Sequence, residues 1–272
     1  MKLEYVYKYP KTLLNKGTGF LSDYSHSLNP YTGCSFGCSY CYVRGMPVSI
    51  FRNADWGTWV DIKKSAADIF RKELTKAKTK GPVTIFMSSS TDPYQPIEYK
   101  EQVTRSLLEV MAADPPDFLF VQTRSPLVRR DIDLLQRLGE KVRVSITVET
   151  DREDIRKHFS PGAPPINARL KTLQLLADAG VPTQAAIAPM LPSSEAFPYL
   201  LQSVVHRVCL DDYFMGDGSG GKRTRQLGME ALYKDLDLEE WYHPDAYKIV
   251  YERFKQVFPE DQIYVSQKGF EP

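Results

Sequence analysis

Short apolar runs alternate with longer amphipathic segments along most of the chain. Runs rich in β-branched and aromatic residues, bounded by turn residues, predict buried strands at residues 83–87, 118–122, 142–148, 181–187 and 205–210. Helical periodicity lies between them, at residues 62–77, 99–111, 127–138, 166–179 and 194–203. Gly139 and Gly180 stand where helix C-caps are expected. This alternation predicts repeated βαβ units around one parallel sheet.

Polar motifs follow the predicted strands at the points where the strands end. They are SSSTDPYQP, TRS, ET and APMLP, and a cysteine-rich loop follows an earlier short strand. Because ligands bind at the carboxyl ends of parallel strands, we expect these motifs to share one site. A helix at residues 238–258 and a short strand at 262–265 have no place in this scheme and are assigned to a C-terminal extension. The segment GDGSGG at 216–221 predicts a flexible loop.

Composition and charge narrow the class of protein. The 272 residues are 42% hydrophobic and 25% charged, which is typical of a folded globular protein. The net charge of +1 excludes a global attraction to phosphate backbones, so any nucleic-acid binding must be local. The chain has no apolar run long enough for a membrane helix and starts without the apolar core of a signal peptide. We therefore expect a cytoplasmic protein without membrane contact, and a monomer.

Three of the four cysteines lie within eight residues, in NPYTGCSFGCSYCYVRG. Cys34, Cys38 and Cys41 have the spacing CxxxCxxC, and no fourth cysteine lies nearby. Three thiolates fit an iron–sulfur cluster better than a structural zinc ion, which usually has four ligands. One iron is then open to the amine and carboxylate of S-adenosylmethionine, whose sulfonium the cluster can reduce. Two other interpretations remain: a zinc site completed by Cys209 or a histidine, and three unconnected cysteines.

The cysteine spacing, with Tyr40 directly before the last cysteine, resembles the signature of the radical S-adenosylmethionine superfamily. More narrowly, the chain resembles the branch similar to spore photoproduct lyase. That resemblance rests on motifs found in the expected order: LNPYTGCSFGCSYCYVR, SSSTDPYQPIE, TRSPLVRRDIDLL, SITVET, SPGAPPINARLKTLQLLADAGV and IAPMLP.

The resemblance implies an α/β fold, a partial (β/α)6 TIM-like barrel of the radical S-adenosylmethionine type. The core is expected at residues 25–215, preceded by a segment at 1–24 and followed by the extension at 216–272. The implied cofactors are a 4Fe-4S cluster and S-adenosylmethionine, and the implied partner is an external electron donor of the flavodoxin or ferredoxin type. The implied activity is that of a lyase-like radical enzyme.

The resemblance also assigns roles at the strand ends. Cys34, Cys38 and Cys41 would bind the cluster, and Tyr40 would lie at the cofactor. The amino group of S-adenosylmethionine would contact the hydroxyl-rich segment Ser90, Thr91 and Asp92, although Asp92 also fits a helix N-cap and turn.

The remaining cofactor contacts are expected from later strands and one helix. Arg124 stands where relatives have a lysine facing the methionine carboxylate; a surface arginine is the alternative. Arg169 competes for that role or is a solvated helix arginine. Ser145 and Glu149 lie on one face of a strand and can bind the ribose hydroxyls or another polar part of the cofactor. Met190 would contact adenine or simply pack in the core.

The substrate is far less evident. Spore photoproduct lyases depend on a cysteine near the second strand, where this chain has only serines. Cys209, Tyr94 and Tyr213 are the candidates for returning a hydrogen atom, although Cys209 also fits a small core residue. Three hypotheses remain: a radical enzyme acting on a nucleotide or nucleic acid, a radical enzyme modifying a peptide, protein or small metabolite, and a non-enzymatic metal-binding module. The cations at residues 222–225 fit either phosphate binding or an ordinary loop, and Arg129 and Arg130 fit a solvated helix face.

Overall fold

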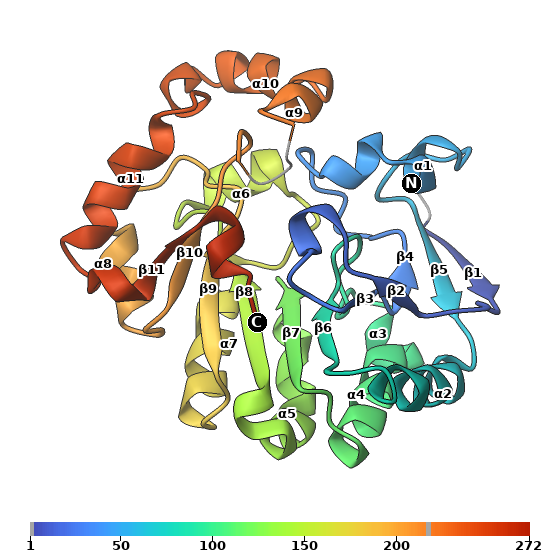
Figure 1. Cartoon of the computed structure of the whole chain (residues 1–272). Helices are drawn as coiled ribbons and strands as arrows, with labels where there is room; N and C mark the ends of the chain where they lie inside the picture. Colours follow the sequence, from blue (N-terminus) through green and yellow to red (C-terminus); the bar gives the residue numbers. More distant parts are fainter. Residues whose placement is uncertain (1–2, 216–218) are drawn as a thin grey trace.

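The computed structural model describes residues 3–215 and 219–272, and its main element is an eight-stranded sheet (Figure 1). The strand order is β11-β10-β9-β8-β7-β6-β3-β2, and all neighbours are parallel except β2 and β3. The strands are β2 (Leu14–Lys16), β3 (His26–Leu28), β6 (Thr84–Met87), β7 (Phe118–Thr123), β8 (Val142–Thr147), β9 (Thr183–Ile187), β10 (Val208–Leu210) and β11 (Ile263–Val265). The expected α/β fold with a partial barrel is confirmed.

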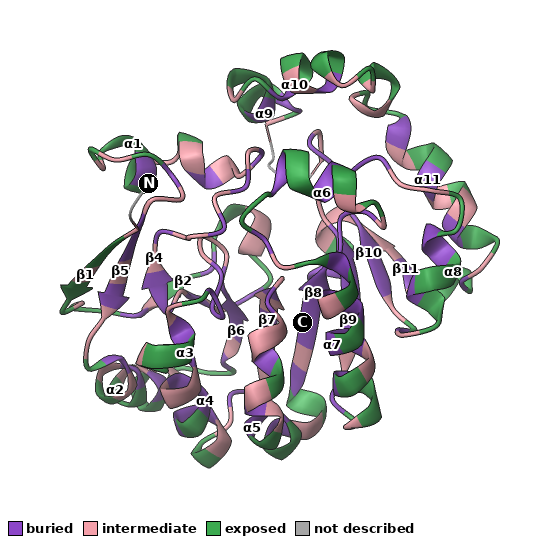
Figure 2. Cartoon of the chain, turned by 180° about the vertical axis from the view of Figure 1, so that it is seen from behind, coloured by how far each residue is buried: buried purple, intermediate pink, exposed green. Residues whose placement is uncertain are grey.

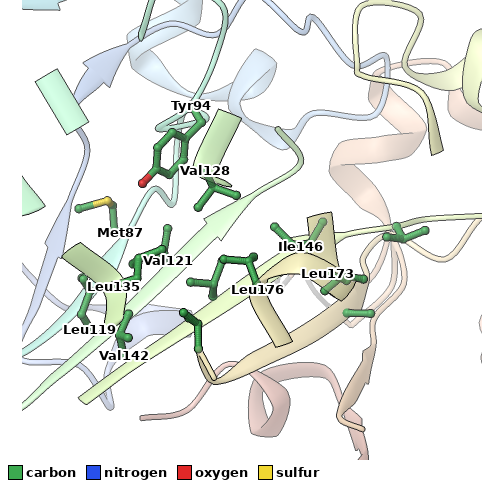
Figure 3. Packing of buried hydrophobic residues seen from close by; sticks show 14 of the residues in the cluster. Met87, Tyr94, Leu119, Val121, Val128, Leu135, Val142, Ile146, Leu173 and Leu176 are labelled. Atoms are coloured by element: carbon green, nitrogen blue, oxygen red, sulfur yellow. The ribbon is translucent and has the colours of Figure 1, made fainter. Parts of the chain in front are cut away.

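Helices cover the outer face of this sheet. They are α2 (Ala66–Lys78), α4 (Val103–Ala113), α5 (Ile132–Leu138), α7 (Ile166–Asp178), α8 (Phe197–Gln202) and α11 (Ala246–Lys255). The main core lies between helices and strands, where Met87, Val121, Leu135 and Leu173 are completely buried (Figure 3). In Figure 2 the strands are mostly buried, whereas the helices expose their outer faces. Burial of this continuous apolar layer is the main stabilisation of the fold.

A second, three-stranded sheet was not predicted from the sequence. It consists of β1 (Glu4–Lys8), β5 (Trp59–Lys63) and β4 (Tyr31–Thr32). The helix predicted at 62–77 therefore starts later, as α2, because the preceding residues pair with distant strands. β1 pairs with β5 in parallel and β4 pairs with it in antiparallel orientation. Tertiary hydrogen bonding thus overrides the helical pattern at the start of that segment.

Other predicted helices are shorter or divided. The helix predicted at 99–111 is split into α3 (Glu98–Glu101) and α4 at Gln102, which has a positive φ of 51°. The predicted helix at 127–138 begins as a 3-10 helix at Pro126–Asp131 and continues as α5. The helix predicted at 238–258 is divided into a 3-10 helix at Glu239–Trp241 and α11. Gly139 and Gly180 have the positive φ angles expected of helix ends.

The C-terminal extension continues the main sheet. β11 pairs in parallel with β10, and Phe270 then packs inside the partial barrel with Tyr24, Phe86 and Phe120. The hydroxyl of Tyr24 donates a hydrogen bond of 2.6 Å to the Phe270 carbonyl. We call the cluster of Tyr24, Phe86, Phe120, Ala186, Cys209 and Phe270 the inner cluster. It fills the inside of the barrel and leaves the carboxyl ends of the strands for other groups.

Four short helices lie beyond the carboxyl ends of the strands, toward the top of Figure 1. They are α1 (Pro47–Ile50), α6 (Glu153–Phe159), α9 (Lys222–Gln226) and α10 (Met229–Asp235). No helix in the described ranges has the length and apolar character required to cross a membrane. The first three residues of the predicted flexible loop at 216–221 lie outside the described residues.

Candidate functional site

The cysteine loop connects β4 to a 3-10 helix, η2 (Tyr42–Gly45). Cys38 is buried, and Cys34 and Cys41 are half-buried. The backbone N–H of Ser39 donates to the Phe159 carbonyl at 2.9 Å. The guanidinium of Arg44 donates to the carbonyls of Cys38 at 2.9 Å and of Gly37 at 2.7 Å. These bonds satisfy backbone groups of the loop and fix its conformation.

Two glycines permit the close packing of this loop. Gly33 has a φ of +85°, and a Cβ atom there would lie 2.6 Å from the Trp59 side chain. A Cβ atom on Gly162 would lie 2.6 Å from the carbonyl oxygen of Phe36, inside the loop. Both positions therefore require glycine because neighbouring atoms occupy the space of a side chain.

We expect Gly162→Ala to displace the cysteine loop, because the new methyl group collides with the Phe36 carbonyl. Overpacking of this kind costs about 1 to 3 kcal/mol. Urea unfolding should show this loss, and the buried Cys38 should react faster with a thiol reagent in the folded protein. Gly45→Ala is the matched control, since a Cβ atom there meets nothing within 4 Å. Equal thiol reactivity in the two variants would contradict the prediction.

The three thiols of the loop influence each other electrostatically. Burial raises the pKa of Cys34 and of Cys41, and the negative charge of Cys38 raises both further. In the described part of the chain, no three cysteine, histidine or carboxylate groups form a ready metal site. Cys209 belongs to the inner cluster, away from the loop, so it does not complete a four-thiolate set with the three loop cysteines.

A network of charges adjoins Cys38. One guanidinium nitrogen of Arg124, Nη1, lies 2.6 Å from Cys38 Sγ, 3.1 Å from the Tyr40 hydroxyl and 3.2 Å from a Glu149 carboxylate oxygen. Tyr40 donates to Glu149 at 2.5 Å. Arg169 Nη1 binds the second oxygen of Glu149, also at 2.5 Å. The structure thus brings together Tyr40, Arg124, Glu149 and Arg169 beside one cysteine.

This network carries a net positive charge. Burial by itself would raise the pKa of Glu149, but the positive charges of Arg169 and Arg124 lower it to about 2. Glu149 is therefore ionised at neutral pH, and together with the two arginines it sums to one positive charge, with the Asp92 carboxylate nearby at the Arg124 backbone. Arg169 is completely buried on α7 rather than solvated, and its Nη2 atom has no hydrogen-bond partner. Such an arrangement favours an anionic ligand.

Asp92 connects the ends of β6 and β7. Its carboxylate accepts hydrogen bonds from the Thr123 hydroxyl at 2.7 Å and from the backbone N–H groups of Arg124 and Tyr94, both at 2.9 Å. The bond to Tyr94 closes a turn of the kind considered as the alternative for this residue. Asp92 therefore orients the backbone from which the Arg124 side chain starts.

Two residues that the sequence interpretation missed hold the serine segment against the cysteine loop. Asn29 accepts a hydrogen bond of 3.0 Å from the Ser90 N–H. Gln95 donates to the Gly33 carbonyl at 3.3 Å and accepts from the Ser35 N–H at 3.0 Å. The hydroxyl of Thr91 also donates to the Gly33 carbonyl. Asn29 lies in the motif LNPYTGCSFGCSYCYVR and Gln95 in SSSTDPYQPIE, and each directly precedes a proline. Their place in these motifs was the only sequence signal for a role at the site.

The other predicted cofactor residues lie deeper in the protein. Ser145 is completely buried in the barrel and accepts a hydrogen bond of 3.2 Å from Gln184. Met190 packs in the main core, and its backbone N–H donates to the Asp211 carbonyl at 2.7 Å. Neither residue contacts the charged network through a described hydrogen bond.

The three hydrogen-relay candidates lie in three different places. Tyr94 is buried in the main core, next to Val128 and Met87 in Figure 3. Cys209 lies in the inner cluster. Tyr213 packs near the cysteine loop, with its ring centre 6.2 Å from that of Tyr40. Only Tyr213 therefore shares a cluster with the candidate site.

The expectation that Arg130 lies on a solvated helix face requires correction. Arg130 is not part of a solvated helix face, because its guanidinium binds Glu98 and Asp131, both of which are completely buried. The Glu98 carboxylate also accepts hydrogen bonds from Tyr31 and from the Thr104 N–H. This network supports the helices beneath the serine segment.

The chain is similar in sequence to several known proteins. The chain is 31% identical to an uncharacterized protein of Methanocaldococcus jannaschii over 64% of its length and 31% identical to one of Acidianus two-tailed virus over 66%. It is 29% identical to an uncharacterized protein of Mycobacterium tuberculosis over 67%. The matched regions span 63%, 61% and 54% of these relatives, respectively, which is less than two thirds of their own lengths.

Solved structures show the same fold. A spore photoproduct lyase mutant superposes with a TM-score of 0.66 at 19% identity, over 96% of this chain and 81% of the lyase. The enzyme SuiB of Streptococcus suis bound to S-adenosylmethionine superposes with a TM-score of 0.52 at 13% identity, over 97% of this chain and 47% of SuiB. The family model of the radical SAM superfamily, where SAM is S-adenosylmethionine, matches residues 28–195, which contain the cysteine loop and the charged network. The chain therefore belongs to the radical S-adenosylmethionine superfamily and is an enzyme of that class.

Proposed function

We propose that Cys34, Cys38 and Cys41 hold a 4Fe-4S cluster at which the protein reductively cleaves S-adenosylmethionine. The observation that carries this proposal is the isolated set of three thiols beside a positively charged network. Three sulfurs leave one iron open for a ligand, which a closed four-ligand site would not. When bound, the cluster supplies the electron that breaks the sulfonium bond and produces a 5'-deoxyadenosyl radical.

The surrounding residues bind and orient S-adenosylmethionine in this proposal. Arg124 is the residue that meets the methionine carboxylate, because its side chain is 17% exposed whereas that of Arg169 is completely buried. Arg169 holds Glu149, and Glu149 in turn fixes the guanidinium of Arg124. The serine segment, with Ser90 and Thr91, provides acceptors for the amino group. Asp92 acts mainly by positioning Arg124.

The remaining predicted contacts belong to the adenosine part. Ser145 lies on β8, Glu149 lies two residues beyond the carboxyl end of that strand, and Met190 follows β9. We place the core at 25–215, of which the family model matches residues 28–195, and the extension at 216–272 adds β11 to the main sheet. We further propose that Tyr213 is the preferred hydrogen relay, since of the three candidates it is the one packed against Tyr40.

The proposed substrate is a nucleotide or nucleic acid from which the radical abstracts a hydrogen atom. Support comes from the similarity in fold to spore photoproduct lyase complexed with dinucleoside spore photoproduct, with a TM-score of 0.65. The alternative, a peptide or protein, is supported by the similarity to SuiB bound to its precursor peptide, with a TM-score of 0.50. The same radical chemistry serves both classes, so the pocket decides between them.

The test is anaerobic reconstitution with iron and sulfide, followed by reduction with dithionite in the presence of S-adenosylmethionine. Formation of 5'-deoxyadenosine is measured by chromatography with and without oligonucleotides or peptides. Stimulation by oligonucleotides supports the first substrate class, and stimulation by peptides supports the second. A protein that retains zinc and never forms 5'-deoxyadenosine would refute the proposed function.

Arg124→Ala is expected to weaken the binding of S-adenosylmethionine by about tenfold or more, because a charge-assisted pair with the carboxylate is lost. Iron content should remain unchanged, since the loop sulfurs are intact. Isothermal titration of the reconstituted protein measures the affinity. Arg124→Lys should recover part of it, because the charge is kept and only the two-pronged geometry is lost. Unchanged affinity in Arg124→Ala would assign the carboxylate to another residue.

A further inference from the structure

An apolar ridge lies on the surface directly after the cysteine loop. In and after α1, Val48, Ile50 and Phe51 expose 38%, 62% and 86% of their surfaces. Pro47 is exposed as well. We call these four residues the α1 ridge. Single exposed apolar residues are ordinary, but a contiguous group indicates an interaction surface.

The α1 ridge follows directly after residues that pack with two of the loop cysteines. Val43, Trp56 and Trp59 form a small buried cluster, against which Cys34, Cys41 and Met46 pack. Met46 immediately precedes α1, and Phe51 is ten positions from Cys41 in the sequence. The ridge is therefore connected to the sulfurs by a short, well-packed segment.

Positive charges lie beside this ridge. Helix α9 carries Lys222, Arg223 and Arg225, all exposed, and no acidic residue. Both α9 and α1 pack against η2, and they lie at the same end of the molecule in Figure 1. The surface thus combines apolar side chains with a cationic margin.

We propose that the α1 ridge and α9 together form the docking surface for an acidic one-electron carrier protein of the flavodoxin or ferredoxin type. This inference rests on the proposed function, which requires an electron for each cleavage. The carrier would be oxidised by one electron, which would pass through a cluster held by Cys34, Cys38 and Cys41 to the sulfonium of S-adenosylmethionine; the bond between sulfur and C5' would then break, giving methionine and the 5'-deoxyadenosyl radical and leaving the cluster in its oxidised state. An apolar centre with charged margins suits the small, short-lived interfaces of electron-transfer partners.

A nucleic acid fits this surface less well. Phosphate backbones bind through many cationic contacts, and base stacking requires several aromatic side chains. The α1 ridge offers one aromatic residue, Phe51, among aliphatic ones that contribute nothing to a phosphate contact. The apolar part of the surface is explained by a protein partner.

The test compares two reductants and also measures binding directly. In Ile50→Ser combined with Phe51→Ser, dithionite-driven formation of 5'-deoxyadenosine should stay close to that of the unchanged protein, because a small reductant needs no docking. Formation driven by a reduced flavodoxin should fall about tenfold or more. Isothermal titration with the oxidised flavodoxin, which involves no turnover, should show a similar loss of affinity.

Matched variants separate this surface from general effects. Ile249→Ser removes an aliphatic side chain that is 60% exposed on α11, and it should leave flavodoxin binding unchanged. Lys222→Glu should weaken binding most strongly at low salt, because screening shortens the range of surface charges. Lys171→Glu, on the exposed side of α7, is the charge control and should have no effect.

The outcomes distinguish the two proposals. Unchanged flavodoxin binding in the ridge variants would overturn the docking surface even if dithionite drives normal cleavage. Equal losses with dithionite and flavodoxin would also overturn it, since the ridge would then act on the cluster or on S-adenosylmethionine. Loss of oligonucleotide binding with intact flavodoxin binding would assign the surface to the substrate instead. Absence of cleavage in the unchanged protein with dithionite refutes the proposed function, whatever the binding measurements show.

Discussion

Replacement of Cys38 by alanine is expected to abolish the iron–sulfur cluster and all formation of 5'-deoxyadenosine while the protein stays folded. With two thiolates left, the loop can no longer hold three irons of the cluster. The backbone contact that fixes this position survives, because Arg44 binds the carbonyl of residue 38 and not its side chain. Iron analysis and the visible absorption of the reconstituted protein measure the loss of the cluster. Chromatography measures the loss of 5'-deoxyadenosine formation, and circular dichroism measures whether the protein stays folded.

Cys209→Ala is the matched control for a buried cysteine. Its thiol lies in the inner cluster and contacts the Ser266 carbonyl at 3.6 Å, away from the loop. This variant should retain its full iron content. Turnover that persists in Cys38→Ala, or iron that is lost in Cys209→Ala, would show that the ligand assignment is wrong.

Glu149→Gln is expected to lower the free energy of unfolding by about 3 to 5 kcal/mol, because it leaves the buried Arg169 and the half-buried Arg124 without their carboxylate. Glu149 is almost completely buried and pairs with Arg124 at 3.2 Å and Arg169 at 2.5 Å. The amide has nearly the same shape, so the loss reflects charge rather than packing. Urea unfolding at neutral pH measures the difference.

An exposed ion pair provides the control. Asp154→Asn removes a carboxylate that is 59% exposed and pairs with Arg152, and it should cost less than about 1 kcal/mol. The pH dependence gives an independent check, since the pKa of Glu149 is lowered in the folded protein from 4.5 to about 2. Stability from this carboxylate is complete above the unfolded value and is lost as the pH falls through that range. The difference between Glu149→Gln and the unchanged protein should therefore shrink below pH 4.5; a difference that stays constant would contradict the charge explanation.

The main sheet could be predicted from the sequence because its strands are short, apolar and flanked by helices. The strand at 118–122 was found as β7 within one residue of its end. The second sheet could not be predicted, since Glu4–Lys8 and Trp59–Lys63 pair across more than fifty residues and neither is a continuous apolar run. Pairing between distant segments is decided by tertiary contacts, which local patterns do not contain.

The cysteines were identifiable because their spacing itself determines the chemistry. The interactions among Arg124, Glu149 and Arg169 could not be predicted from the sequence, because these residues belong to different parts of the chain and meet only in the folded protein. Arg169 illustrates the limit: in sequence it resembles any helix arginine, yet it is the most buried charged member of the site. Asn29 and Gln95 were not predicted as site residues because amides next to prolines usually belong to ordinary turns.

The inner cluster affects the order in which a growing chain can complete its site. Phe270 and β11 join the barrel from the last residues described, whereas the cysteine loop leaves the ribosome more than two hundred residues earlier. During synthesis the three thiols therefore emerge before Arg124 and Glu149, and long before the barrel is closed behind them. The barrel behind the cysteine loop is accordingly complete only after residue 270 has been translated.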